Sequence, residues 1–151
     1  MRICLVYDCL YPYNIGGAER WLRGLGEDLV SRGHEVTYVT RRDWKKGEEP
    51  AIEGFRVGPV SPGGALYTPS GRRRIWPAIR FGIGVFFHML RHKRDYDAVH
   101  AIAFPYFSLI ASRPAAPKLE TGVDWFEVWS PHYWRNYVGG PAGRIGHAVQ
   151  R

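Results

Sequence analysis

The sequence contains few of the features that mark a secreted, metal-binding or membrane-spanning protein. Two cysteines, Cys4 and Cys9, are too few for a disulfide framework, so we expect reduced thiols. No signal-peptide pattern opens the chain, and the longest apolar stretch, Ile75 to Leu90, is too short and too interrupted to span a bilayer. The six histidines form no ligand cluster, so no metal site is predicted. We therefore expect a cytoplasmic protein.

Acidic residues are scarce relative to basic ones. Fourteen Asp and Glu stand against twenty-one Lys and Arg, and the formal net charge of +7 favours an anionic partner such as a nucleotide phosphate, an acidic lipid or a nucleic acid. No zinc spacing, helix-turn-helix or RNA-recognition signature is present, so nucleic acid is not an expected partner. The composition is 45% hydrophobic and 23% charged, which is typical of a globular domain, and 151 residues suffice for one.

Hydrophobic periodicity predicts an α/β domain. A continuous apolar run at 2–7 predicts a buried strand, helical spacing predicts a helix over 18–32, and 35–40 predicts a second strand. Strand, helix and strand in this order form a right-handed parallel unit, so we predict a three-layer, Rossmann-like domain with a mainly parallel sheet. The remaining elements are expected as strands at 55–60, 98–103 and 118–123, as helices at 72–94, 105–112 and 143–151, and as an aromatic loop that reaches Tyr137.

The strongest local motif is Ile15-Gly-Gly-Ala-Glu-Arg20, which follows the first predicted strand and opens the first helix. A helix N-terminus presents unpaired N–H groups and the positive end of its dipole, and glycines let an anionic group approach the backbone. Open α/β sheets bind ligands at the carboxyl ends of their strands. Gly16 and Gly17 are therefore candidate phosphate-binding residues, whereas Glu19 is equally well explained as a first-turn carboxylate that the dipole favours.

The sequence resembles the family-4 glycosyltransferases, which have the two-domain GT-B fold and retain the anomeric configuration. The resemblance is carried by the stretch 2–41, by Tyr96-Asp-Ala-Val-His-Ala101, and by Glu127-Val-Trp129 followed by Tyr133-Trp134. It implies that residues 1–151 are the N-terminal, acceptor-side domain of a nucleotide-sugar-dependent transferase. Nothing in the sequence terminates the last predicted helix, so we expect the chain to stop before a C-terminal donor-binding domain and to be inactive alone.

The resemblance also implies roles for individual residues. Gly16 and Gly17 would bind the phosphates and sugar of the donor, a nucleotide-diphosphate sugar that is a substrate, and no cofactor is expected. Many relatives carry a histidine directly before Glu-Val-Trp, where this chain has Phe126, so a polar contact near the transferred sugar would be missing. A histidine on an apolar strand is more often a core residue, which favours a structural role for His100. The candidates for the acceptor side are Arg20, His100, Glu127 and Trp129.

The helix predicted at 72–94 has basic ends around an aromatic and aliphatic body. Such a helix either lies on an anionic bilayer or packs its apolar face on the sheet with solvated ends, and the sequence favours neither. Several members of the resembled family act on lipid-linked acceptors, so peripheral attachment at the inner membrane surface is an alternative to a freely cytoplasmic protein. The candidate membrane-surface residues are Arg72, Arg73, Arg74, Trp76, Lys93 and Arg94.

Two other functions are compatible with parts of the sequence. A nicotinamide-dependent dehydrogenase needs Gly-x-Gly-x-x-Gly directly after the first strand and an acidic residue at the end of the second. Here Gly24 and Gly26 fall within the predicted helix and the second strand is followed by Arg41 and Arg42, which argues against it. A non-catalytic acceptor-binding or membrane-recruiting subunit of a split glycosyltransferase remains an alternative to the catalytic domain.

Overall fold

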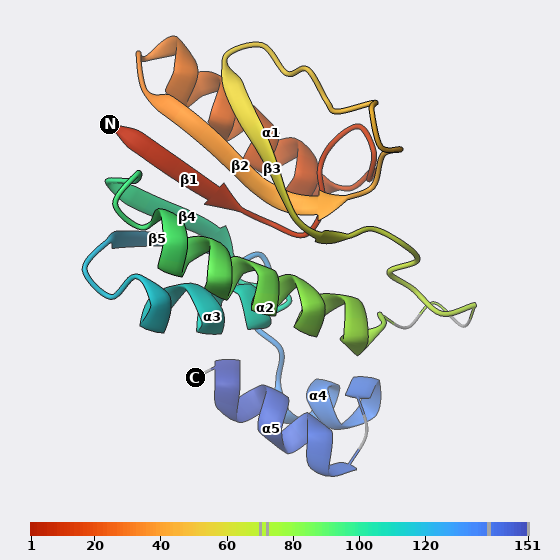
Figure 1. The fold of residues 1–151 in the computed structure, drawn as a ribbon. Coiled ribbons are helices and arrows are strands. Elements are labelled where there is room, and N and C mark those ends of the chain that lie inside the picture. The colour runs from red at the N-terminus through yellow and green to blue at the C-terminus, as the bar shows by residue number, and fades with distance from the viewer. Residues whose placement is uncertain (70, 72, 139, 151) are drawn as a thin grey trace.

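A parallel five-stranded sheet in the order β3-β2-β1-β4-β5 organises the chain (Figure 1). The structure is a computed structural model that describes residues 1–69, 71, 73–138 and 140–150. Strand β1 is central, so it is buried on both faces, which explains its continuous apolar sequence. The predicted mainly parallel, Rossmann-like fold is confirmed. The strands are β1 (Arg2–Val6), β2 (Glu35–Arg42), β3 (Phe55–Pro62), β4 (Ala98–Ile102) and β5 (Glu120–Asp124).

Helices cover both faces of the sheet and produce the predicted three layers (Figure 1). Helix α1 (Gly17–Ser31) packs on one face, where Leu22 contacts the same cluster as Leu5 of β1. Helices α2 (Ile75–His92) and α3 (Phe107–Ala115) cover the other face, where Phe81 packs with Val6. Neighbouring residues of β1 thus belong to opposite cores. Among the described residues, no helix combines the length and the apolar content needed to cross a membrane.

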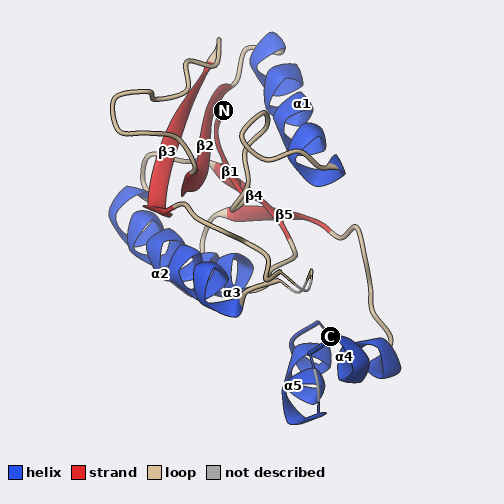
Figure 2. Cartoon of the chain, turned by 90° about the vertical axis from the view of Figure 1, so that its right-hand side faces the viewer, coloured by secondary structure: helices blue, strands red, loops and turns tan. Residues whose placement is uncertain are grey.

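Two short helices, α4 (Pro131–Val138) and α5 (Gly140–Gln150), form a hairpin beyond the sheet (Figure 2). The sequence-based prediction of a loop up to Tyr137 is wrong here. The side chain of Ser130 accepts a hydrogen bond from the backbone N–H of Tyr133 at 3.2 Å, and Pro131 occupies the first helical position. Both are standard signals for a helix start. The many aromatic residues that surround them in the sequence favoured the prediction of a loop instead.

The remaining differences from the sequence-based prediction lie at element ends. Helix α2 begins at Ile75 instead of 72, helix α3 spans Phe107–Ala115 instead of 105–112, and helix α5 begins at Gly140 instead of 143. Such shifts of a few residues are expected when periodicity alone defines a boundary, because the contacts that cap a helix do not follow the hydrophobic period.

Two glycines allow α2 to pack closely against its neighbours. A Cβ on Gly84 would overlap the backbone carbonyl oxygen of Val60 in β3, and a Cβ on Gly82 would lie 2.9 Å from the backbone of Phe107 in α3. Backbone atoms cannot move aside as a flexible side chain can, so these positions require glycine. Helix α2 is therefore held between β3 and α3, with a fixed face directed outward.

Gly84→Ala is expected to destabilise the chain by about 1–3 kcal/mol, because the overlap with β3 outweighs the gain in helix propensity. Gly24→Ala is the matched control, since Gly24 is an exposed helical glycine whose added Cβ would have no atom within 4 Å. That variant should be neutral or more stable by up to about 1 kcal/mol. Urea unfolding followed by circular dichroism measures both, and equal stabilities would contradict the close packing of α2.

Candidate functional site

The predicted glycine turn lies where β1 ends and α1 begins, at the carboxyl edge of the sheet. Gly16 is the N-cap of α1 in an extended conformation, with φ of −164°, and no side chain caps the helix. Gly17 is exposed, and a Cβ built on it would have no atom within 4 Å. The first turn of α1 therefore combines unpaired N–H groups with open space at a residue that has no side chain.

The Glu19 side chain folds back over Gly16. A Cβ built on Gly16 would meet the Glu19 carboxylate, which places this carboxylate at the start of its own helix. There it interacts favourably with the positive end of the helix dipole, as the first-turn interpretation of Glu19 expects. An anionic ligand at the same helix end would have to displace the carboxylate, which the flexible side chain of glutamate permits.

Arg20 lies beside this turn and contacts the loop that precedes α1. The guanidinium carbons of Arg20 and Arg23 lie 5.2 Å and 5.7 Å from the centroid of the Tyr11 ring, within cation–π range. Arg23 also donates a hydrogen bond to the Tyr11 carbonyl oxygen at 3.2 Å. These contacts fix the loop against α1, while Arg20 itself stays exposed beside Gly16 and Gly17.

A buried ion pair stabilises the same edge of the sheet. Asp8 follows β1 and is fully buried, and its two carboxylate oxygens accept hydrogen bonds from Arg73 Nη2 at 2.7 Å and 2.5 Å. The Arg73 guanidinium carbon also lies 5.4 Å from the ring centroid of Phe104 and 5.8 Å from that of Tyr67. Burial alone lowers the pKa of Arg73, but the charge and hydrogen bonds of Asp8 reverse this and raise it, so the guanidinium stays protonated.

This pairing removes Arg73 from the set of membrane-surface candidates. Its side chain is only 8% exposed and is directed into the protein, because the buried carboxylate of Asp8 needs a cation. The other candidates of known placement are exposed, whereas Arg72 lies outside the described residues. The exposed candidates are Arg74, Trp76, Lys93 and Arg94.

Arg41, in β2, reinforces the edge from the neighbouring strand. Its fully buried guanidinium donates to the Asp8 carbonyl oxygen at 2.8 Å, the Gly64 carbonyl oxygen at 3.1 Å and the Asp43 carboxylate at 2.7 Å. The loop between β3 and α2 is thus held near its start by Arg41 and at its end by Arg73. Neither arginine's role could be recognised from the sequence, because Asp8 and Gly64 lie far from these arginines along the chain.

His100 of β4 is paired with a carboxylate on the face of the sheet that carries α1. Its Nε2 atom lies 2.9 Å from Asp124 Oδ2, and the same oxygen accepts a hydrogen bond from Trp21 Nε1 at 2.7 Å. The ring lies over Gly122, where a Cβ would come within 2.5 Å of His100 Nδ1. Periodicity did not indicate this partnership, which arises because β4 and β5 are adjacent.

The Glu127-Val-Trp129 segment belongs to an aromatic cluster that Gln150 organises. Gln150 Oε1 accepts hydrogen bonds from the backbone N–H of Trp129 and from Trp134 Nε1, both at 3.0 Å, and Gln150 Nε2 donates to the Trp129 carbonyl oxygen at 2.9 Å. Trp129 Nε1 donates to the Glu127 carboxylate at 2.6 Å, and its ring centroid lies 5.2 Å from that of Phe104. Helix α5 is thereby attached to the loops that follow β4 and β5.

The structure thus brings the predicted site residues into three groups. Gly16, Gly17 and Arg20 form one group at the start of α1, and His100 reaches α1 through Asp124 and Trp21. Glu127 and Trp129 lie in the aromatic cluster, which contacts Arg73 through the ring of Phe104.

Two buried titratable side chains at this edge stay neutral. Burial raises the pKa of the Cys9 thiol and of the Tyr7 phenol, and the negative charge of Asp8 adds to both effects. Neither a thiolate nucleophile nor a phenolate base is therefore present here at neutral pH. In the described ranges, no three His, Cys, Asp or Glu side chains are grouped so that they could hold a metal ion.

A parallel sheet with helices on both faces and a glycine turn after its central strand defines a Rossmann-like domain. The chain belongs to Glycosyltransferase Family 4, whose model matches residues 15–145. A Klebsiella pneumoniae protein, described as an uncharacterized 42.6 kDa protein in the cps region, is 37% identical over 57 residues, which are 38% of this chain and 15% of that protein. The match therefore spans only a small part of that relative's length.

The fold itself recurs in a protein with a different description. The crystal structure of the C-terminal domain of a hydrogenase from Pyrococcus furiosus has a TM-score of 0.51 to this chain at 14% identity. The similarity covers 82% of this chain and 92% of that one. At such low identity it shows a common fold and nothing about function.

Arg73→Met is expected to destabilise the chain by about 3–5 kcal/mol, because it leaves the Asp8 carboxylate buried without its cation. Arg74→Met removes the same charge from the exposed neighbouring position and should change stability by less than about 0.5 kcal/mol. Urea midpoints at constant pH compare the two. If both variants unfold at the same urea concentration, the ion pair does not stabilise this edge.

Proposed function

We propose that the chain is the N-terminal domain of a nucleotide-sugar-dependent glycosyltransferase, in which it binds the donor phosphates and forms the acceptor side of the cleft. The family membership supports transfer of a sugar. The observation that carries the donor assignment is the exposed, uncapped start of α1, with open space around Gly17. A diphosphate there would accept hydrogen bonds from backbone N–H groups and interact with the helix dipole.

The contribution of this turn to the reaction is electrostatic. When the bond between the sugar and the leaving diphosphate breaks, negative charge develops on the phosphate oxygens. The N–H donors and the positive helix end are already in place, so they stabilise that charge without reorganising. This electrostatic stabilisation is the main contribution of the domain to the reaction rate. Arg20 is one turn further along the same helix and adds an exposed positive charge beside the site.

The acceptor would contact the segment after β5. Trp125, Phe126 and Val128 are exposed there, and the Glu127 carboxylate is held by Trp129. Phe126 is the apolar residue that stands where many relatives have a histidine, so acceptor or donor preference would differ from theirs. The acceptor is a lipid-linked saccharide, a polysaccharide or a small molecule.

Catalysis in this proposal requires a second, donor-binding domain, because the reacting groups must be enclosed between two domains. The chain by itself is then expected to bind donor weakly and to transfer no sugar. The alternative is a non-catalytic acceptor-binding or membrane-recruiting subunit of a split transferase, which Phe126 favours. Product analysis of the complete protein with a panel of nucleotide sugars distinguishes the two, since only the first yields product.

Gly17→Val in the complete protein is expected to lower sugar transfer by about 10²–10³-fold, because the new side chain keeps the diphosphate from the backbone donors. The fold should be retained, since a Cβ at this position meets no atom. The measurement is the initial rate of product formation, together with the thermal midpoint of unfolding.

Gly24→Val is the matched control for this variant. Gly24 is exposed in the same helix, about two turns further along, and a Cβ there also meets no atom. It introduces the same β-branched residue without approaching the turn, so transfer should be close to that of the parent. Parent-like transfer by Gly17→Val would refute the phosphate-binding role, and an equal loss in both variants would assign the effect to the helix.

A further inference from the structure

Helix α2 buries one apolar face and exposes a second. Ala78, Phe81, Val85 and Met89 are buried at helical spacing, and the last three pack on the sheet. A surface helix normally carries polar residues on its opposite face, whereas a helix that is apolar all round is surrounded by other apolar material. The exposed apolar side chains of α2 are Ile75 (55% exposed), Trp76 (64%), Ile83 (51%), Phe87 (59%) and Leu90 (43%).

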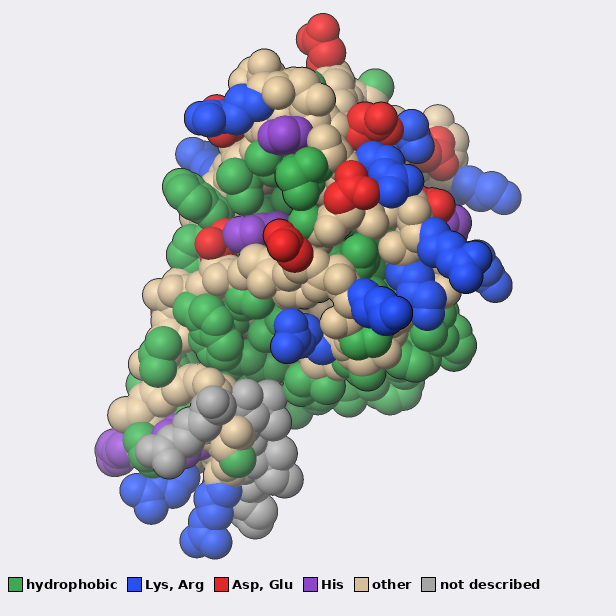
Figure 3. All heavy atoms as spheres, turned by 90° about the vertical axis from the view of Figure 1, so that its left-hand side faces the viewer, with side chains coloured by type: hydrophobic (Ala, Val, Ile, Leu, Met, Phe, Trp, Pro, Cys, Tyr) green, Lys and Arg blue, Asp and Glu red, His purple; other side chains and the backbone are tan. Residues whose placement is uncertain are grey.

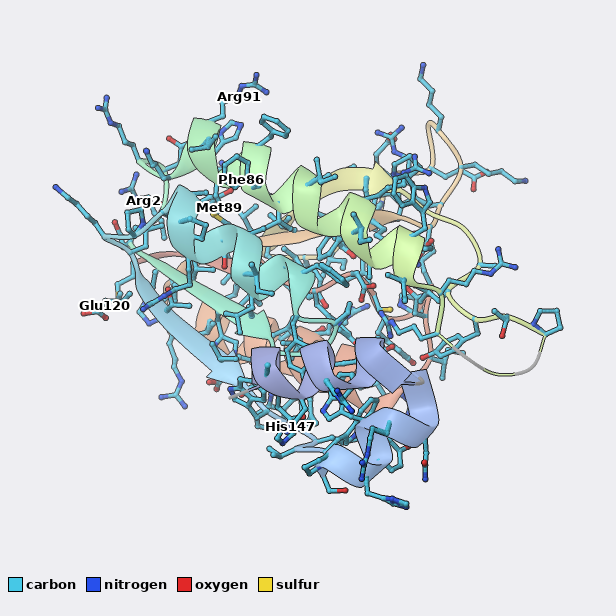
Figure 4. The ribbon with its side chains drawn as sticks, turned by 90° about the horizontal axis from the view of Figure 1, so that it is seen from below. Arg2, Phe86, Met89, Arg91, Glu120 and His147 are labelled. Atoms are coloured by element: carbon cyan, nitrogen blue, oxygen red, sulfur yellow. The ribbon has the colours of Figure 1, made fainter. Side chains whose placement is uncertain are left out.

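The exposed apolar face continues from α2 onto α3. The two helices lie side by side, with Phe86 between them and Arg91 directed away from α3 (Figure 4). Hydrophobic side chains gather along this lower side of the molecule (Figure 3). A groove of about 390 Å³ runs between the helices and is lined almost entirely by apolar atoms. Its lining includes Ile79, Ile83, Phe86, Phe87, Phe107 and Ile110.

Cations border this face, and no carboxylate lies on either helix. Neither α2 nor α3 contains Asp or Glu, whereas Arg80, Arg91 and Arg113 are exposed on them. Arg80 and Arg91 line a second hollow of about 470 Å³, which Ile83 and Phe87 separate from the apolar groove. Positive charge thus lies directly beside exposed apolar side chains, and the nearby carboxylate of Asp95 is bound to His92 at 2.8 Å.

The charge of this border comes from arginine and not from the neighbouring histidine. His88 lines the same hollow, and its Nε2 atom lies 2.8 Å from the hydroxyl oxygen of Tyr96. Burial, with a contribution from His92, lowers the pKa of His88 to about 4, so the ring is neutral at physiological pH. His88 therefore adds no positive charge to the hollow at physiological pH.

We propose that the α2–α3 face docks on an anionic phospholipid bilayer. The apolar side chains of α2 and α3 enter the boundary between headgroups and acyl chains, and Arg80 and Arg91 bind the lipid phosphates. A second copy of the chain is a poorer occupant, because it would bring the same unpaired arginines together in a chain whose net charge is already +7. Charge complementarity therefore selects the bilayer.

The docked face also reaches the carboxyl edge of the sheet, at the start of α2. The N-terminal end of α2 is joined to Arg73, which binds Asp8 at the carboxyl edge of the sheet. An acceptor anchored in the same bilayer would then approach the carboxyl edge of the sheet along the N-terminal end of α2. This last step rests on the proposed transfer function, whereas the docking itself does not.

The test is co-flotation of the chain with vesicles. The chain should float with vesicles of phosphatidylglycerol and phosphatidylcholine in equal parts, and should stay in the dense fraction with phosphatidylcholine alone. The double variant Arg80→Gln, Arg91→Gln should lower the partition coefficient by roughly thirtyfold. Its matched control, Lys45→Gln with Lys46→Gln, removes the same charge from exposed positions of the β2–β3 loop and should change partitioning by less than about twofold.

Ile83→Ser tests the apolar part of the surface and should lower partitioning by about tenfold. Ile15→Ser is its control, because Ile15 precedes α1 and is an even more exposed isoleucine, at 77% against 51% for Ile83. Circular dichroism checks that each variant is folded. If Ile83→Ser does not fold, the Arg80→Gln, Arg91→Gln variant alone tests the proposal, because both arginines are exposed and their replacement should not disturb the fold.

Three outcomes would overturn the proposal. The first is failure of the chain to float with the anionic vesicles. The second is equal flotation of the parent with both vesicle types, together with unchanged flotation of the arginine variant. The third is a stable dimer in light scattering that Ile83→Ser dissociates, which would show that a second copy covers this face. None of these measurements depends on sugar transfer, so failure of docking and failure of the proposed function are distinguishable.

Discussion

The buried charge of Asp8 is the constraint on which the carboxyl edge of the sheet depends. Strand β1 is enclosed on both faces, and Asp8, two residues beyond its end, is still fully buried, so its carboxylate requires a buried cation. Arg73 supplies this cation from the end of the loop before α2, while Arg41 binds the Asp8 carbonyl oxygen from β2. One carboxylate thereby sets the place where α2 begins, next to the turn that starts α1.

Because α2 is fixed at its N-terminal end, the surfaces that it presents are fixed as well. Gly84 brings it against β3 and Gly82 brings it against α3, so it cannot rotate to bury its second apolar face. The exposure of Ile83 and Phe87 is therefore a consequence of the packing and not of a loose helix. The glycine turn and the apolar face lie on opposite sides of the sheet but are coupled through the Asp8–Arg73 pair.

The sequence predicted the elements whose signal is periodic or local, and it missed the contacts between distant segments. Apolar runs and helical spacing sufficed for the parallel sheet, and the glycine pair after β1 sufficed for the candidate phosphate turn. In contrast, Arg73 looks the same as its neighbour Arg74 in the sequence, and only a carboxylate 65 residues earlier directs it inward. His100 likewise required Asp124, which becomes its neighbour only when β4 and β5 pair.

The structure divides the positive charge of the chain into two kinds with different consequences. Arg41 and Arg73 are buried and neutralised by carboxylates, so they contribute nothing to the attraction of a partner. The cations that are accessible beside functional surfaces lie at the start of α1 and on the outer side of α2, on opposite faces of the sheet. Each of the two proposed ligands, a diphosphate and a lipid surface, therefore meets its own group of accessible cations.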